Sequence, residues 1–187
     1  MNKVIENIKK LCPLSDKTIS ELEAKVVKCH FPQKHKLVEA GVYTHYAYFI
    51  EKGMTRSYWM VEGEEITTSF SFEGSIVFSM DELYYGKRSE EYVETLEECE
   101  AYRILLTDLM QLWNTNMELC IWSRIIHQNE YRRLHRSHKD RLTLPAKERY
   151  ESFIKQCPNV IERRNLTYVA SYLGITLSTL SRLRARK

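Results

Sequence analysis

The sequence predicts an α+β fold: an N-terminal antiparallel β-roll, jelly-roll-like, with flanking helices, then a long helix and a C-terminal winged helix-turn-helix. Three observations carry this prediction. The spacing of apolar residues changes from helical to alternating near Val26 and returns to helical near Thr107. Glycines interrupt the alternating stretch at short intervals, as turns between neighbouring strands do. The last twenty residues hold two short amphipathic patterns that meet at Gly174.

Composition limits the protein class. The chain has 187 residues, of which 43% are hydrophobic and 28% charged, typical of a soluble globular protein with material for two small cores. No apolar run is long enough to span a membrane, and the charged N-terminus does not resemble a signal peptide. We therefore expect a cytoplasmic protein without membrane contact. The five cysteines form no C-x-x-C pair and are expected to be reduced.

The first elements are helical. Apolar residues within 2–24 follow one helical face, Pro13 interrupts the pattern, and Ser15 or Asp16 is suited to cap a second short helix at 16–25. Short β-branched and aromatic runs with a period of two then predict strands. The predicted strands are 26–31, 46–51, 55–61, 66–72, 76–78, 92–96 and 102–106. The turns between them are marked by Gly41, Gly53, Glu62-Gly63-Glu64, Gly74 and Gly86.

A long helix is predicted from about Thr107 to Ser137, with apolar side chains on more than one side. One side would pack on the roll and another on a second copy of the chain, although a single wide core face explains the pattern as well. The residues assigned to dimerisation are Trp113, Met117, Ile121, Trp122 and Ile126. Which face meets the partner is left open. After this helix, Thr143 is the expected cap and Pro145 an early residue of a helix that runs to about Gln156, followed by a short wing within 158–165.

The C-terminal stretch has the pattern of a helix-turn-helix. Val169, Ala170 and Leu173 share one face of a first helix, Gly174 supplies a turn position suited to positive φ, and Thr176 is placed to cap the second helix. Hydroxyls and guanidinium groups on the remaining faces can hydrogen-bond phosphates and base edges. The candidate DNA contacts are Thr176, Ser178, Thr179, Ser181, Arg182 and Arg184. The alternative is an ordinary helical hairpin that only caps a domain.

Charge is distributed unevenly. Residues 1–123 contain 13 Lys and Arg against 20 Asp and Glu, net −7, whereas residues 124–187 contain 15 against 5, net +10. A basic segment that contains a helix-turn-helix is typical of nucleic-acid binding. We therefore divide the chain into a β-roll domain at 1–106, a dimerisation helix at 107–140 and a DNA-binding domain at 141–187.

The order of these elements resembles the Crp/Fnr family of transcription regulators over nearly the whole chain. The resemblance is most specific at the C-terminal end, where Ala170-x-x-x-Gly174-Ile175 and Thr179-Leu-Ser-Arg182 are similar to the branch of the family common in Bacteroidetes. In the roll, Gly41 and the segment Tyr48-Phe-Ile-Glu-Lys-Gly53 look like the family's strand pair. The resemblance implies a cyclic-nucleotide-binding type of roll and a homodimer that binds double-stranded DNA, with RNA polymerase as a possible further partner.

The resemblance also places a candidate effector pocket, at Ser79, Met80, Arg88 and Ser89. Family members that bind cyclic AMP or GMP have Gly-Glu-Leu where this chain has Phe78-Ser79-Met80, and Arg-Ser/Thr-Ala where it has Arg88-Ser89-Glu90. The two carboxylates that follow Ser89 would repel a cyclic phosphate. We therefore expect no binding of cyclic AMP or cyclic GMP, and the effector is left unknown. The cysteine cluster of the fumarate-nitrate-regulator branch is also missing.

Other functions are less well supported. His127, His135 and His138 do not share one helix face, so no metal site is expected, and no cofactor. The strands lack the His-x-His and Glu ligands of a cupin-type enzyme, and no nucleophile-base pair is evident, so we do not expect an enzyme. The remaining alternative is a small-molecule-binding roll, or a cupin-like enzyme, without DNA binding.

Overall fold

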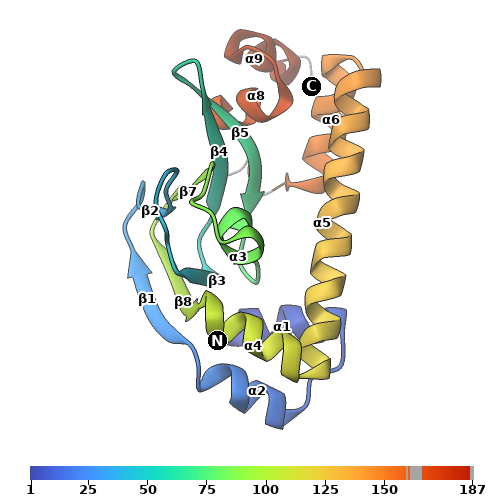
Figure 1. Ribbon diagram of the computed structural model, residues 1–187. Coiled ribbons are helices and arrows are strands. Elements are labelled where there is room, and N and C mark those ends of the chain that lie inside the picture. Colours follow the sequence, from blue (N-terminus) through green and yellow to red (C-terminus); the bar gives the residue numbers. More distant parts are fainter. Residues whose placement is uncertain (159, 161–165, 186–187) are drawn as a thin grey trace.

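The computed structural model describes residues 1–158, 160 and 166–185. A β-roll forms the body of the molecule, and one long helix, α5, runs along its side (Figure 1). The N-terminal helices and α4 lie at one end of α5, and the C-terminal helices lie at its other end beside strands β4 and β5. None of the described helices is both long and apolar enough to cross a lipid bilayer.

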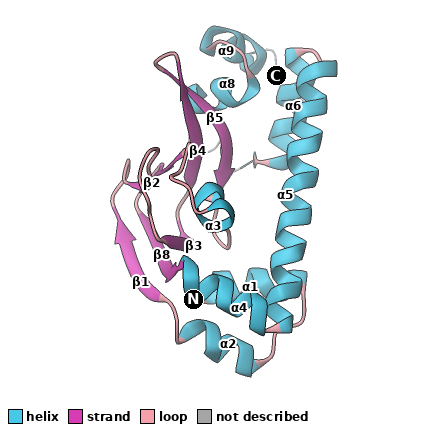
Figure 2. Cartoon of the chain, in the orientation of Figure 1, coloured by secondary structure: helices cyan, strands magenta, loops and turns pink. Residues whose placement is uncertain are grey.

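Helices occupy both ends of the chain and one short stretch of the roll (Figure 2). Their bounds are α1 Asn2–Leu11, α2 Asp16–Glu23, α3 Met80–Tyr85, α4 Leu106–Thr115, α5 Met117–Thr143, α6 Ala146–Gln156, α8 Leu166–Leu173 and α9 Leu177–Ala185. The predicted break after α1 is confirmed, and Ser15 is the cap of α2, since its side chain accepts a hydrogen bond from the Thr18 amide.

The strands form two four-stranded sheets. Their bounds are β1 Val27–Phe31, β2 Lys36–Val38, β3 Tyr46–Lys52, β4 Thr55–Val61, β5 Glu64–Ser71, β6 Ile76–Val77, β7 Tyr92–Thr95 and β8 Cys99–Leu105. The strand orders are β1-β8-β3-β6 and β2-β7-β4-β5, and every pairing is antiparallel. The predicted roll is confirmed. Gly53 shows why one turn needs glycine: its φ is +104°, and a Cβ there would lie 2.5 Å from the Cys99 sulfur.

Two elements of the roll were not predicted. Strand β2 is only three residues long, too short for an alternating pattern to be recognised. Helix α3 follows the predicted strand at 76–78, and its N-cap is Ser79, whose side chain accepts a hydrogen bond from the Glu82 amide. Gly86 ends α3 in the left-handed conformation.

The single long helix predicted at 107–137 is wrong, because Asn116 divides it into α4 and α5. Asn116 is extended, with φ −112° and ψ 112°, and its side-chain oxygen accepts hydrogen bonds from the amides of Glu118 and Leu119. The amide nitrogen of the same side chain donates to Thr18 and Glu21 of α2. A capping residue held by a distant helix therefore ends α4 and starts α5.

The predicted cap at Thr143 is also wrong. Thr143 is the last residue of α5, where its hydroxyl donates to the carbonyl of Lys139. Helix α6 begins at Ala146, directly after Pro145, whose fixed φ suits a helix start. The predicted wing at 158–165 falls mostly outside the described residues.

Two of the hydrophobic cores join the roll to helices at opposite ends of the chain. The first combines α1, α2, α4 and the start of α5 with strands β3 and β8. The second joins roll residues Met54, Phe70 and Leu96 to side chains of α6, α8 and α9, including the fully buried Leu180. The C-terminal helices therefore pack on the roll in this structure. The proposed domain boundaries at 106 and 140 stay predictions.

Candidate nucleic-acid interface

The C-terminal helix pair has the geometry that the sequence predicted. In α8, Val169, Ala170 and Leu173 are buried, and Gly174 has a φ of +64° at the turn. The fully buried Leu180 anchors α9 on the second core. Burial of these apolar faces leaves the opposite side of α9 to polar side chains.

The start of α9 is a connected group of hydroxyls. Thr176 is the cap, because its hydroxyl oxygen accepts a hydrogen bond from the Thr179 amide at 3.2 Å. The Thr176 hydroxyl also lies 3.0 Å from the Ser178 hydroxyl and 2.9 Å from that of Thr179. One turn later, the Arg182 guanidinium donates to the Thr179 hydroxyl at 3.2 Å. This contact holds the Arg182 side chain over the first turn of α9.

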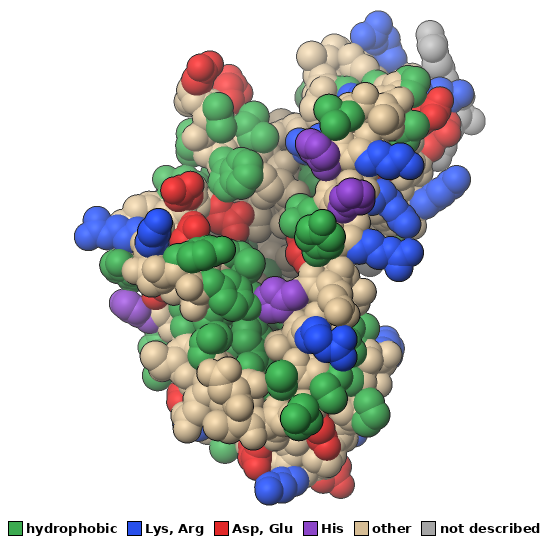
Figure 3. Space-filling view, turned by 45° about the vertical axis from the view of Figure 1, so that its right-hand side comes forward, with side chains coloured by type: hydrophobic (Ala, Val, Ile, Leu, Met, Phe, Trp, Pro, Cys, Tyr) green, Lys and Arg blue, Asp and Glu red, His purple; other side chains and the backbone are tan. Residues whose placement is uncertain are grey.

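The structure places most of the candidate DNA contacts on an open surface. The exposed members are Thr176, Ser178, Ser181, Arg182 and Arg184, and Thr179 is half-buried. Lys and Arg side chains gather over the part of the molecule where the second half of α5, α6 and α9 lie (Figure 3). An exposed helix face with hydroxyls and guanidinium groups, next to further basic residues, is suited to contact phosphates and base edges.

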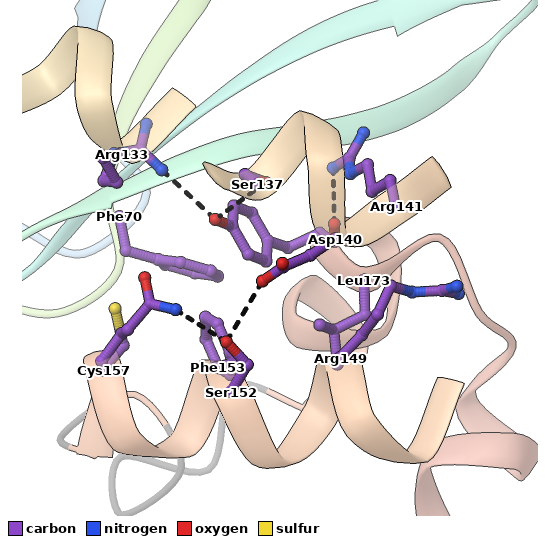
Figure 4. Close-up of a pocket in the computed structure, with 12 residues that line it drawn as sticks. Phe70, Arg133, Ser137, Asp140, Arg141, Arg149, Ser152, Phe153, Cys157 and Leu173 are labelled. Carbon is purple, nitrogen blue, oxygen red and sulfur yellow. Dashed lines mark hydrogen bonds between the residues drawn. The ribbon is translucent and has the colours of Figure 1, made fainter. Parts of the chain in front are cut away.

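A cavity of about 50 Å³ lies where α5, α6, α8 and β5 meet (Figure 4). The rings of Phe70, Phe153 and Tyr172 form one part of its wall, with centroids 5.1–6.0 Å apart. At its edge the Arg133 guanidinium donates to the Tyr172 hydroxyl at 3.2 Å, and Asp140 accepts from Ser152. A space of this size holds a few water molecules. We interpret it as a packing gap at the joint between the long helix and the helix-turn-helix.

The candidate effector residues are mainly structural. Ser79 is fully buried as the cap of α3, and Ser89 is 2% exposed with its hydroxyl donating to the Glu91 carbonyl at 2.9 Å. Met80 and Arg88 are exposed, and the Arg88 guanidinium lies 5.9 Å from the centre of the Tyr43 ring. Both hydroxyls are buried and hold the local backbone, so neither Ser79 nor Ser89 is open to a ligand in this structure, and the effector pocket stays a prediction.

The loop at 86–91, between α3 and β7, contains two of the candidate effector residues and is called the candidate effector loop; its surroundings are acidic. Burial, together with the negative charges of Asp81 and Glu130, raises the pKa of Glu91 to about 7. Glu130 lies on α5, so the long helix contributes to these acidic surroundings. The His127 ring nitrogen Nε2 is 2.7 Å from the Tyr84 hydroxyl and links α5 to α3. No group of three or more His, Cys, Asp or Glu within the described part of the chain is arranged to hold a metal ion.

The predicted dimerisation residues separate into two groups. Trp113 and Trp122 are only 6% and 3% exposed and belong to the core of the single chain, so their assignment to a dimer interface is wrong. The sequence could not show this, because an aromatic side chain on a helix suits either surface. Met117 is 73% exposed, and Ile121 and Ile126 are half-buried.

Two buried charged residues, Arg56 and Glu94, are not predicted from the sequence. Arg56 in β4 is 1% exposed and forms ion pairs with Glu65 and Glu94. The guanidinium lies over the rings of Tyr58 and Tyr168, at 4.2 and 3.6 Å from their centres. A single arginine in a strand of seven residues gives no sequence signal for burial, because strand arginines are usually exposed.

Comparisons with known proteins agree with this architecture. Residues 28–116, from β1 to the end of α4, match the family model of the cyclic nucleotide-binding domain. Among curated proteins, none matches the sequence.

Solved structures of three other proteins are similar to this chain over most of their length. The c-di-GMP-responsive global regulator CLP of Xanthomonas campestris has a TM-score of 0.70 at 17% identity, over 92% of this chain and 91% of that one. FixK2 of Bradyrhizobium japonicum has a TM-score of 0.73 at 17% identity, over 86% and 83%. A protein of Eubacterium rectale assigned to the Crp/Fnr family of transcriptional regulators has a TM-score of 0.71 at 13% identity, over 92% and 83%. At these identities the similarity establishes the fold.

Proposed function

We propose that this chain is a sequence-specific DNA-binding transcription regulator of the Crp/Fnr type that binds double-stranded DNA as a homodimer in the cytoplasm. The observation that supports this most directly is α9, whose apolar side is buried while Ser178 in its first turn and Arg182 in its last turn lie exposed. The fold similarity to the regulators above and the surplus of basic residues after residue 123 add support. RNA polymerase is a candidate partner of the DNA-bound protein.

Repeated selection from a pool of random duplex DNA tests the proposal. The protein should enrich a common sequence, and the enriched duplex should bind more tightly than random DNA at physiological salt. A pool that stays random after several rounds would contradict sequence-specific binding.

Within α9 we expect Arg182 to read bases and Arg184, nearer the C-terminal end, to contact phosphate. Arg182→Ala should cost about 1 to 3 kcal/mol on the selected site and relax its sequence preference, because base contacts discriminate by this amount. Arg184→Ala should weaken all sequences alike and lower the slope of log K against log salt by about one. Titrations on selected and random duplexes at several salt concentrations measure both effects. Equal losses of affinity on both duplexes for Arg182→Ala would show that Arg182 is a phosphate contact. The control is Arg103→Ala, which removes an arginine of the roll.

We further propose that the effector is not cyclic AMP or cyclic GMP. Ser79 stands where the ribose-binding carboxylate would be and is closed off as a helix cap. Glu90 directly follows Ser89, and its exposed carboxylate disfavours an approaching phosphate. Calorimetric titration with either nucleotide should show no heat of binding at micromolar concentrations, whereas a micromolar Kd would refute this expectation.

The dimer should form along the outward face of α5. Met117, Tyr131 and Leu142 are 73%, 72% and 73% exposed. Together with Ile121 they fall on one side of α5, at positions that alternating steps of three and four residues would reach, as along the seam of a coiled coil. Tyr131→Glu should raise the dimer dissociation constant at least about tenfold, because twofold symmetry places the buried charge in the interface twice. Sedimentation velocity over a range of concentrations measures this shift.

The matched control is Val27→Glu, which replaces a 56% exposed apolar residue of β1 and should leave association unchanged. A dimer that is equally stable in both variants would exclude this face of α5 as the interface.

A further inference from the structure

Strand β5 is one edge of its sheet, and α8 is docked on it. In the sheet order β2-β7-β4-β5, one side of β5 has no neighbouring strand among the residues that the structure describes. Ser57 pairs with Ser69 and Tyr58 pairs with Thr67, so β5 has one extra residue between these pairs, a β-bulge. The Ser171 hydroxyl of α8 accepts a hydrogen bond from the Thr67 amide and donates to the Glu65 carbonyl, both at 2.9 Å. The first helix of the helix-turn-helix therefore satisfies edge groups that would otherwise need water.

The second docking point is the buried guanidinium of Arg56. Its Nε donates to Glu94 at 2.7 Å, and a further nitrogen pairs with Glu65. The planar group also stacks on Tyr58 of the same strand and on Tyr168 of α8. Stacking of arginine on an aromatic ring in a desolvated site favours one relative orientation of the two groups. Tyr168 is therefore held in place by a side chain whose other partners, within the described part of the chain, belong to the roll.

Arg56 and its partner Tyr58 contact residues of β7, the strand that directly follows the candidate effector loop. Tyr92 directly follows this loop, at the start of β7, and stacks on Tyr58 with centroids 5.0 Å apart and an interplanar angle of 12°. Glu94, in the same strand, is the carboxylate bound to the Arg56 Nε. A shift of β7 would consequently change both the ring under Tyr58 and the ion pair of Arg56.

We propose that Arg56 is a positioning residue that sets the orientation of the helix-turn-helix on the roll, with Tyr168 as the side chain that receives it. This inference rests on the proposed function. In a dimer, fixed docking of both helix pairs sets the distance between the two α9 helices, and this distance must match the spacing of two half-sites on DNA. The Arg56–Tyr168 pair therefore affects simultaneous binding to two half-sites. It does not affect the contacts by which one α9 recognises one half-site.

The test compares Tyr168→Leu, which removes the stacking ring but keeps the Arg56 ion pairs, with Tyr168→Phe, which keeps the ring. On duplex DNA with two selected half-sites, Tyr168→Leu should lose at least about tenfold in affinity, because avidity depends on geometry that engages both sites. Affinity for a duplex with one half-site should stay at the wild-type value, and Tyr168→Phe should behave as wild type on both. Tyr46→Leu removes a ring stacked on Arg103 in the other sheet and is the matched control.

A second measurement does not depend on DNA. The Thr67 amide, which donates to Ser171, should exchange its hydrogen at least about tenfold faster in Tyr168→Leu than in wild type or Tyr168→Phe. Unchanged exchange in a folded Tyr168→Leu protein would overturn the proposal, as would equal losses on one and two half-sites. A wild-type protein that binds no selected DNA would refute the proposed function alone, since the exchange result reports on the docking by itself.

Discussion

Replacement of Trp122 by alanine should reduce the free energy of unfolding by about 3 to 5 kcal/mol, the usual cost of removing a buried tryptophan. Trp122 is 3% exposed and packs on Phe49 and Trp113, with ring centroids 6.0 and 6.3 Å away. The cavity would open where α5 meets the roll. Denaturant unfolding followed by circular dichroism measures the change.

The control for this prediction is Asn129→Ala, an exposed position of the same helix, which should change stability by less than about 0.5 kcal/mol. If Trp122 instead served only as a dimer contact, its alanine variant would lose stability only at protein concentrations at which the wild type is dimeric. A loss that is independent of concentration supports the core position.

Glu91 should make the protein less stable as pH rises from about 5 to 8. Its pKa is about 7 in the folded chain because of burial and the charges of Asp81 and Glu130, against 4.5 in the unfolded chain. Between these two values the folded state binds the proton more tightly. The contribution of Glu91 is therefore fully present below pH 4.5 and is lost as pH rises through 7, by up to about 3 kcal/mol.

Glu91→Gln should remove this part of the pH dependence and stabilise the protein at pH 8. Urea unfolding at pH 5, 6, 7 and 8 measures the difference between the variant and wild type. Glu90→Gln, in the same loop but exposed, should keep the wild-type dependence on pH. An identical dependence in wild type and Glu91→Gln would show that the Glu91 carboxyl ionises as freely in the folded chain as in the unfolded one.

The sequence by itself determined the elements whose pattern is local. The alternation of the strands, the cap at Ser15, the positive φ of Gly174 and the cap at Thr176 all depend on residues within a few positions of one another. For the same reason the buried and exposed faces of α8 and α9 could be assigned correctly. The candidate DNA-reading residues follow from those faces.

Only the tertiary structure decided features that depend on distant contacts. Asn116 is a residue type suited to cap a helix, but Thr18 and Glu21, which hold its side chain at the break, lie 98 and 95 residues away in the sequence. Trp122 faces the core because the roll lies on that side of α5. The burial of Arg56 requires two carboxylates and two tyrosines from three strands and a helix, which only folding brings together. Local periodicity determines which face of an element is apolar, whereas the identity of the surface that covers it depends on packing across the whole chain.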